Sequence, residues 1–279
     1  MKKISLFATA AICFSSVAFA QNNNSLKLKK GQKYVVENKI ATASSTEMQG
    51  QSMEVNVDVT STYSIEVKDV VDNNYNLTNT VTGIKMNMTQ MGQEMSYDSD
   101  KKEDSTNPIG STLKDFINQP KNIVIDKSGK IIPQKTEEKT DEVNIMSKQL
   151  GNLEATGYGA NMAFESLPKD VKVGSAWSNK TDEDGIVKMT NYKVTAINGN
   201  IATISLDGTI SSDTKMENQG MEITTKTTGK FTGEEKVDIS TGVVQSNTST
   251  IDASGIVGVM GQELPTSSKV TSTTTVKPL

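Results

Sequence analysis

Residues 53–67 read Met-Glu-Val-Asn-Val-Asp-Val-Thr-Ser-Thr-Tyr-Ser-Ile-Glu-Val, an almost strict alternation of apolar and polar side chains. The apolar residues stand on odd positions, and Ser61 is the interruption. Successive side chains of a β-strand point to opposite faces, so this period of two predicts one long strand with a dry face and a wet face. Residues 202–216 repeat the alternation and predict a second long strand.

A change of phase near Gly83 predicts a break in this regular pattern. Apolar residues stand on odd positions between the turn signal at 72–74 and Val81, and on even positions from Ile84 to Met88. One extra residue in a strand resets the face that each later side chain takes, and such a β-bulge often contains glycine. We therefore expect a bulge at Gly83, in a strand that follows a tight turn.

The period of the pattern changes between the two strand-rich halves. Apolar residues recur there at helical spacing, after threonines that can cap a helix: Val143, Met146, Leu150 and Leu153. The sequence thus predicts a mainly β fold with a helical insert at about 108–118 and 138–166. A sheet with one apolar face must cover that face. We expect long antiparallel strands in a half-barrel or a sandwich, with a helix at 140–155 as a partial lid.

Residues 1–20 have the three parts of a secretory signal peptide. Lys2 and Lys3 form the positive region, Ile4 to Val17 are mostly apolar, and Ala18-Phe19-Ala20 is a small-x-small cleavage site. The apolar stretch is too short to span a bilayer, which takes about 20 residues. We expect cleavage after Ala20, export to the periplasm or the outer surface, and no transmembrane segment in the mature chain.

Residues 21–279 are expected to form a single, mostly β domain. Short internal likenesses indicate a duplicated unit, about 26–104 and 168–276, around the insert. Lys29-Lys30-Gly31-Gln32-Lys33-Tyr34 matches Lys172-Val173-Gly174-Ser175-Ala176-Trp177, and Tyr63-Ser64-Ile65-Glu66-Val67 matches Tyr192-Lys193-Val194-Thr195-Ala196. Chance alignment of threonine-rich strands is the alternative.

The composition argues against several classes of function. The chain has no arginine and no histidine, and its one cysteine, Cys13, lies in the expected signal peptide. The mature chain therefore lacks imidazole, thiolate and guanidinium groups, and we expect neither an enzyme nor a bound cofactor. With 29 basic against 33 acidic residues, the net charge of −4 does not favour nucleic acid as a partner.

The one-sided strands suggest what the protein could bind. The leading hypothesis is a non-enzymatic envelope protein whose concave sheet binds an apolar ligand or a protein partner. The alternative is a structural or adhesive surface module without a ligand. The candidate ligand contacts are residues of the apolar strand faces and of the expected lid: Val55, Val57, Val59, Tyr63, Ile65, Met86, Met88, Leu150 and Leu153.

Methionines gathered near the expected hairpin tips provide a third hypothesis. Thioethers bind Cu(I), and exported copper proteins use spaced methionines for this purpose. The candidate copper ligands are Met86, Met88, Met91 and Met95. The alternative is that these flexible apolar side chains pack the hairpin ends or contact an apolar ligand.

Three motifs together resemble an uncharacterised family, a domain of unknown function, of exported Bacteroidota proteins. They are Leu28-Lys29-Lys30-Gly31-Gln32-Lys33-Tyr34, Ile125-Asp126-Lys127-Ser128-Gly129-Lys130 and the segment from Leu167 to Trp177. Long strands with an inserted helix are also similar to periplasmic half-barrel lipoprotein carriers and lipid binders. That resemblance implies an apolar ligand. Those carriers latch their lid with an arginine, which this chain lacks.

Overall fold

The computed structural model describes residues 26–132 and 158–279, except Gln49, Met91, Asn107, Asp115, Asp184, Gln219, Gly220 and Met260. The expected signal peptide at 1–20 and the expected lid helix at 140–155 lie outside these residues. The described elements are β1 Lys33–Met48, β2 Gln51–Val71, β3 Asn74–Gln90, β4 Gln93–Asp98, η1 Lys102–Thr106, α1 Pro108–Leu113, β5 Pro120–Ile125, β6 Ile131–Ile132, α3 Tyr158–Ala163, β7 Ala176–Glu183, β8 Ile186–Asn198, β9 Ile201–Asn218, β10 Met221–Asp238, β11 Val244–Val259 and β12 Gln262–Pro278.

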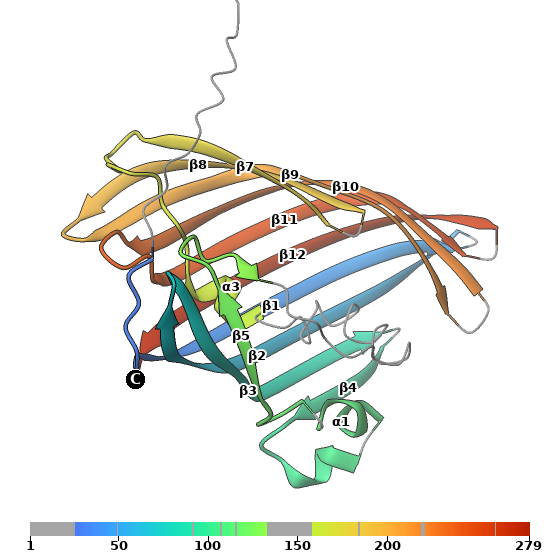
Figure 1. Ribbon diagram of the computed structural model, residues 1–279. Coiled ribbons are helices and arrows are strands. Elements are labelled where there is room, and N and C mark those ends of the chain that lie inside the picture. Colours follow the sequence, from blue (N-terminus) through green and yellow to red (C-terminus); the bar gives the residue numbers. More distant parts are fainter. Residues whose placement is uncertain are drawn as a thin grey trace, which may run out of the picture.

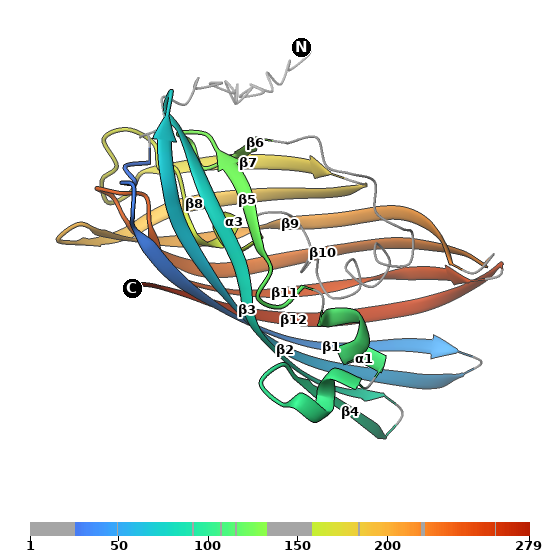
Figure 2. The ribbon, with the colours of Figure 1, turned by 60° about the horizontal axis from the view of Figure 1, so that its bottom comes forward.

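The strands form one antiparallel sheet, so the fold is the predicted mainly β class and not a sandwich of two sheets. Its order is β6-β5-β3-β2-β1-β12-β11-β10-β9-β8-β7, and β4 pairs with β3. The sheet arches into an open half-barrel with α3 and β5 beneath the arch (Figures 1 and 2). The two halves of the chain join where β1 pairs with β12, from Tyr34 opposite Pro278 to Thr46 opposite Thr266.

Strand β2 behaves as its alternation predicts. Its odd-numbered side chains face the inside of the arch, and Tyr63, Ile65 and Val67 are fully buried there. Apolar residues of neighbouring strands stand in register on the same face and close around α3. Phe164, directly after α3, packs edge-on against Tyr34 at 5.6 Å between ring centroids. The main core thus fills one end of the arch.

A second, smaller core covers part of β2 and β3. Val59, Ile84 and Met86 pack with Tyr97 of β4 and Leu113 of α1. The expected insert at 108–118 therefore includes a short helix that covers apolar sheet surface. The second part of the insert, 138–166, contributes α3 within its described residues.

The predicted bulge is present in β3. Thr62 pairs with Gly83, but Tyr63 pairs with Val81, so Thr82 is the extra residue. The bulge does not require glycine for space, because a Cβ on Gly83 would meet Ser99 and Thr62 no closer than 3.8 Å. The turn before β3 is also as predicted, with Asp72 and Asn73 in the left-handed region at φ 51° and 64°.

The two turns that resemble each other in sequence have the same hydrogen bonds. Gly31 N donates to Val67 O at 2.8 Å, and Gly174 N donates to Val194 O at 2.9 Å. Each glycine has a positive φ, 86° and 88°. These bonds align Val67 with Val194, two residues away from the expected alignment of Tyr63 with Tyr192. The duplication itself stays a prediction.

Glycines on the inner face let the strands of the C-terminal half approach closely. A Cβ on Gly208 in β9 would lie 1.9 Å from Met189 O and 2.8 Å from the Phe231 ring. A backbone oxygen cannot move aside as the end of a flexible side chain can. The tight curvature near Phe231 therefore depends on the missing Cβ.

Replacing Gly208 with alanine is expected to destabilise the fold by about 1–3 kcal/mol or more, because it overpacks backbone against backbone. Gly83→Ala is the matched control and is expected to cost less than about 1 kcal/mol, since its Cβ has ordinary space. Chemical denaturation of both variants measures the difference. Equal costs would show that the close approach at Gly208 does not shape the sheet.

Candidate functional site

Beyond the packed core, the inner face of the sheet continues as an apolar surface that we call the inner trough. Registers between neighbouring strands place its residues on the same face as the core, and all of them are partly buried, interspersed with threonine and serine. The apolar residues of the inner trough are Ile40, Val55, Val57, Met88, Ile210, Ile251, Val257, Val259, Leu264 and Val270.

The structure divides the predicted ligand contacts into two groups. Val59, Tyr63, Ile65 and Met86 are buried by protein in the two cores. Val55, Val57 and Met88 are partly buried and belong to the inner trough. Leu150 and Leu153 lie outside the described residues.

The candidate copper ligands are partly brought together. Met88 in β3 stands directly opposite Met95 in β4, and Met86 stands opposite Tyr97. Met86 is buried in the smaller core, whereas Met95 is 41% exposed. Met91 lies outside the described residues. Copper binding stays a prediction.

A cavity of about 270 Å³, the inner pocket, opens on the inner face where the trough reaches α3. Ile251 belongs to both the trough and the pocket, so the two adjoin at this residue. Most of its lining is polar or aromatic, in contrast to the trough. The lining residues used below are Met162, Glu165, Lys188, Tyr192, Phe231, Glu235, Asn247 and Thr274.

Two carboxyl groups lie in the inner pocket, one buried at Glu235 and one partly buried at Glu165. Glu235 stands on the inner face of β10 and is 5% exposed. Glu165 follows α3, and its backbone N donates a 2.9 Å hydrogen bond to Gly242 O. Burial and the nearby charge of Glu235 raise the pKa of Glu165 to about 8. Burial raises the pKa of Glu235 to about 7, against the lowering effects of its hydrogen bond with Asn247 and of Lys188.

The same pocket holds a lysine and two aromatic rings. The Lys188 ammonium lies 4.7 Å from the centroid of the Phe231 ring, within cation–π distance. Partial burial lowers the pKa of Lys188, although both carboxylates act to raise it and the residue keeps an exposed surface. Trp177 stacks on Tyr192 at 5.0 Å between ring centroids and stiffens this wall.

A buried polar contact joins the pocket to the β1–β12 pairing. Asn38 in β1 is buried, and its side-chain oxygen accepts hydrogen bonds from Thr274 at 3.1 Å and Ser272 at 3.2 Å in β12. Thr274 also lies 3.7 Å from the Met162 sulfur. The pocket is lined by side chains from around α3 and from the C-terminal strands, and Asn38 of the N-terminal half holds one of them, Thr274, by a hydrogen bond.

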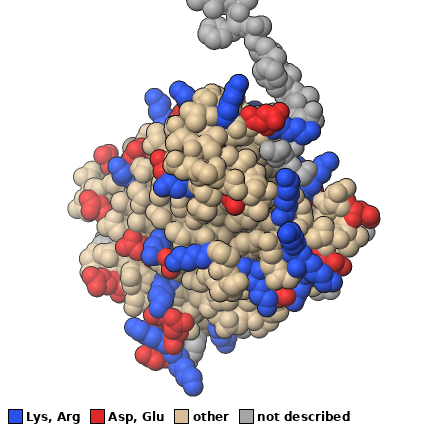
Figure 3. Space-filling view, turned by 90° about the vertical axis from the view of Figure 1, so that its left-hand side faces the viewer, with Lys and Arg blue, Asp and Glu red and all other residues tan. Residues whose placement is uncertain are grey.

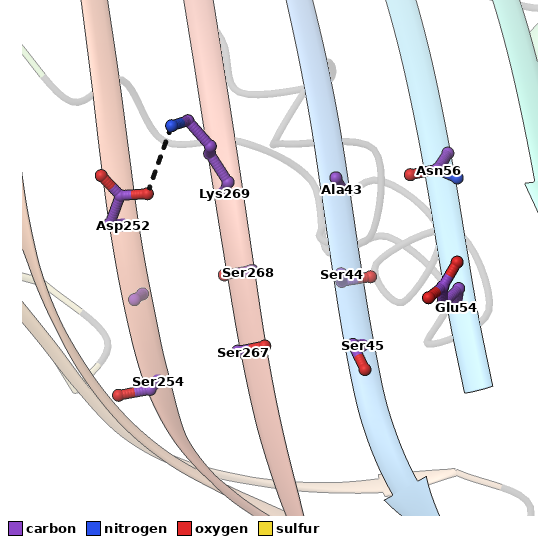
Figure 4. A pocket seen from close by; sticks show the side chains of 11 residues that line it. Ala43, Ser44, Ser45, Glu54, Asn56, Asp252, Ser254, Ser267, Ser268 and Lys269 are labelled. Carbon is purple, nitrogen blue, oxygen red and sulfur yellow. Dashed lines mark ion pairs between the residues drawn. The ribbon is translucent and has the colours of Figure 1, made fainter. Parts of the chain in front are cut away.

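A larger hollow of about 550 Å³ lies on the outer side of β2, β1, β12 and β11 (Figure 4). Small polar residues such as Ser45 and Ser267 line it, together with exposed charged side chains. Lys269 and Asp252 form a 3.8 Å ion pair there. Solvated small side chains offer little to hold a ligand, so the smaller inner pocket is the better candidate site.

The end of the arch that the main core fills presents a surface where lysines and acids are interspersed (Figure 3). No described helix is both long and apolar enough to cross a membrane. Within the described residues, no group of three or more His, Cys, Asp or Glu side chains is placed to hold a metal ion.

Sequence reasoning missed the acidic pocket. Its signal is a charged residue in the apolar phase of a strand: Glu235 follows Phe231 and Gly233 on inner positions of β10, and Lys188 precedes Tyr192 on inner positions of β8. Glu165 has no such signal, because it lies outside regular structure after α3.

Fold and site together define an open antiparallel half-barrel with an apolar inner face and an acidic pocket at its filled end. The chain belongs to the family of unknown function DUF6263, whose model matches residues 72–244. No curated protein matches the sequence.

Solved structures resemble the fold. A lipovitellin structure, described by its lipid–protein interactions, has a TM-score of 0.50 and 12% identity over 90% of this chain, which spans only 25% of the lipovitellin chain. OccK7 (OpdD) from Pseudomonas aeruginosa has a TM-score of 0.28 at 5% identity, covering 89% of this chain and 100% of its own. An outer membrane channel from Pseudomonas putida F1 has 0.26 at 8%, covering 91% and 98%.

The raised pKa values of Glu165 and Glu235 predict that the protein loses stability as the pH rises. The unfolded chain releases these protons near pH 4.5, whereas the folded chain retains them up to about 7 and about 8. The free energy of unfolding should therefore fall between these limits, by about 1.4 kcal/mol for each unit by which folding raises a carboxyl pKa. Thermal denaturation across this range measures the fall. Glu235→Gln should reduce it, and Glu234→Gln, on the exposed outer face of the same strand, should leave it unchanged.

Proposed function

We propose that this protein is a non-enzymatic, exported binding protein that holds an apolar or amphiphilic ligand in the inner trough. The observation that supports this is the continuation of the apolar inner face beyond the packed core, where its residues stay partly exposed. Apolar surface that a chain leaves open in a concave shape is commonly a binding surface for a ligand or a partner.

The likeness to lipovitellin is consistent with this proposal. The fold is similar, and the lipovitellin structure concerns lipid–protein interactions. A curved sheet offers one apolar face to a ligand and the other to water. The proposal of export rests on the expected signal peptide at residues 1–20. The proposal of a non-enzymatic role rests on a sequence without histidine or arginine.

The alternative is a structural or adhesive module with a filled interior. Its support is the burial of Val59, Tyr63, Ile65 and Met86 by protein. The two proposals differ at the trough, where the binding protein must accept an alkyl chain and the structural module need not.

Calorimetric titration with dodecanol, a neutral alkyl chain, tests the proposal. We expect saturable binding with a negative heat-capacity change, the mark of apolar burial. Val55→Asp places a charge on the trough and is expected to weaken binding at least about tenfold. Asn56→Asp adds the same charge to the exposed outer face of β2 and should bind dodecanol as the wild type does.

The wild-type titration also distinguishes the alternative. Absence of dodecanol binding, together with native mass spectra that show a bare chain after purification from its own envelope, would favour the structural module.

A further inference from the structure

The inner pocket holds two acidic groups and one basic group among its described lining residues. Glu235 and Glu165 both line it, and among the described residues Lys188 is the one cation whose charge acts on both. Carboxylates removed from water are costly unless a cation or hydrogen-bond donors compensate them. Near neutral pH a retained proton supplies part of that compensation, because burial raises the pKa of both carboxyl groups.

Each strand packed around these carboxyl groups contributes described side chains to the pocket. Strand β8 contributes Lys188 and Tyr192, β11 contributes Asn247, and β12 contributes the neutral Thr274. Asn247 hydrogen-bonds with Glu235, and burial raises the pKa of Tyr192, which therefore stays neutral. The charge that remains to be balanced is the second carboxylate.

Aromatic faces make the pocket suitable for an ammonium group. The Lys188 ammonium lies 4.7 Å from the centroid of the Phe231 ring, and the charges of Glu165 and Glu235 act on it. Carboxylates beside aromatic rings are the usual means of binding organic ammonium ions. Lys188 is thus a cation of the protein itself in this pocket, and the amine of a ligand could bind the carboxylates beside it or in its place.

The size of the pocket limits what can enter it. At about 270 Å³ it is smaller than the usual pocket for a complete drug-sized ligand, about 300–1,000 Å³. It suits a head group, while the adjoining trough beyond Ile251 offers the apolar surface that an alkyl tail needs.

We propose that the inner pocket is the head-group site of the inner trough and binds a protonated amine, so that the ligand is a cationic amphiphile. This assignment rests on the proposed function, because the tail of the ligand occupies the trough. Binding an ammonium requires ionised Glu165 and Glu235, so it releases protons from the pocket near neutral pH.

Three ligands with the same alkyl chain and different head groups test the assignment: dodecylamine, dodecanol and dodecanoate, each kept below its micelle concentration. We expect the full chain to bind dodecylamine at least about tenfold more tightly than dodecanol, and dodecanoate more weakly than dodecanol. The preference for the amine should increase from about pH 6 to about pH 8, as the carboxyl groups ionise.

Variants identify the groups responsible. Glu235→Gln should remove most of the preference for dodecylamine and leave dodecanol binding unchanged, while the control Glu234→Gln keeps the wild-type preference. Lys188→Gln should increase dodecylamine affinity, about threefold or more, because it removes the built-in cation. Titration of the wild type in buffers of different ionisation enthalpy measures the proton release. This measurement tests the head-group assignment even if Glu235→Gln does not fold.

The outcomes separate the two proposals. If neither dodecylamine nor dodecanol binds, the proposed function fails. If both bind equally, without proton release and without an effect of Lys188→Gln, the trough binds alkyl chains but the head-group assignment is wrong.

Discussion

The pairing of β1 with β12 is the interaction on which the rest of the structure depends. It joins strands from opposite ends of the described chain and turns two strand meanders into one continuous sheet. Without it, each half would expose a long strand edge and a narrow apolar face. The buried contact of Asn38 with Thr274 and Ser272 lies within this pairing. A buried hydrogen bond of this kind is satisfied in one register and left unpaired in a shifted one.

Within the described residues, the curved sheet has an inner face that is filled at one end and partly exposed further along. At the filled end, α3 and Phe164 pack against β1 and β2, and the core excludes solvent. Further along the strands, α3 and Phe164 no longer cover the same face, and its apolar residues are partly buried. Glycines such as Gly208 permit the close approach that bends the C-terminal strands. One physical requirement, burial of an apolar face, is thus met fully at one end and partly at the other.

Charged side chains at the boundary between these parts give the site its chemistry. Glu235 is buried and Glu165 partly buried where the core ends, and burial together with the nearby charge of Glu235 raises the pKa of Glu165. Their burial is a cost to folding that rises with pH, because ionised carboxylates are poorly solvated there. Perturbed pKa values of this kind cluster at functional sites, and in the proposed binding role they would connect the stability of the fold with occupation of the pocket.

The sequence by itself determined the local features: the long strands, the inward phase of Val55 to Val67, the turn at 72–74 and a bulge beside Gly83, whose extra residue is Thr82. These follow from side-chain alternation, which neighbouring residues alone decide. The tertiary structure decided that the sheet is one open half-barrel, that Tyr63 is buried while Val55 is not, and that Glu165 meets Glu235. Such facts depend on which distant strands pair and where α3 packs, and period-two alternation is the same in a strand whose face is filled and in one whose face is open. Glu235 could have been suspected as a charge in an apolar phase, but its partner Glu165 lies in irregular chain, where no periodicity indicates which side chain points inward.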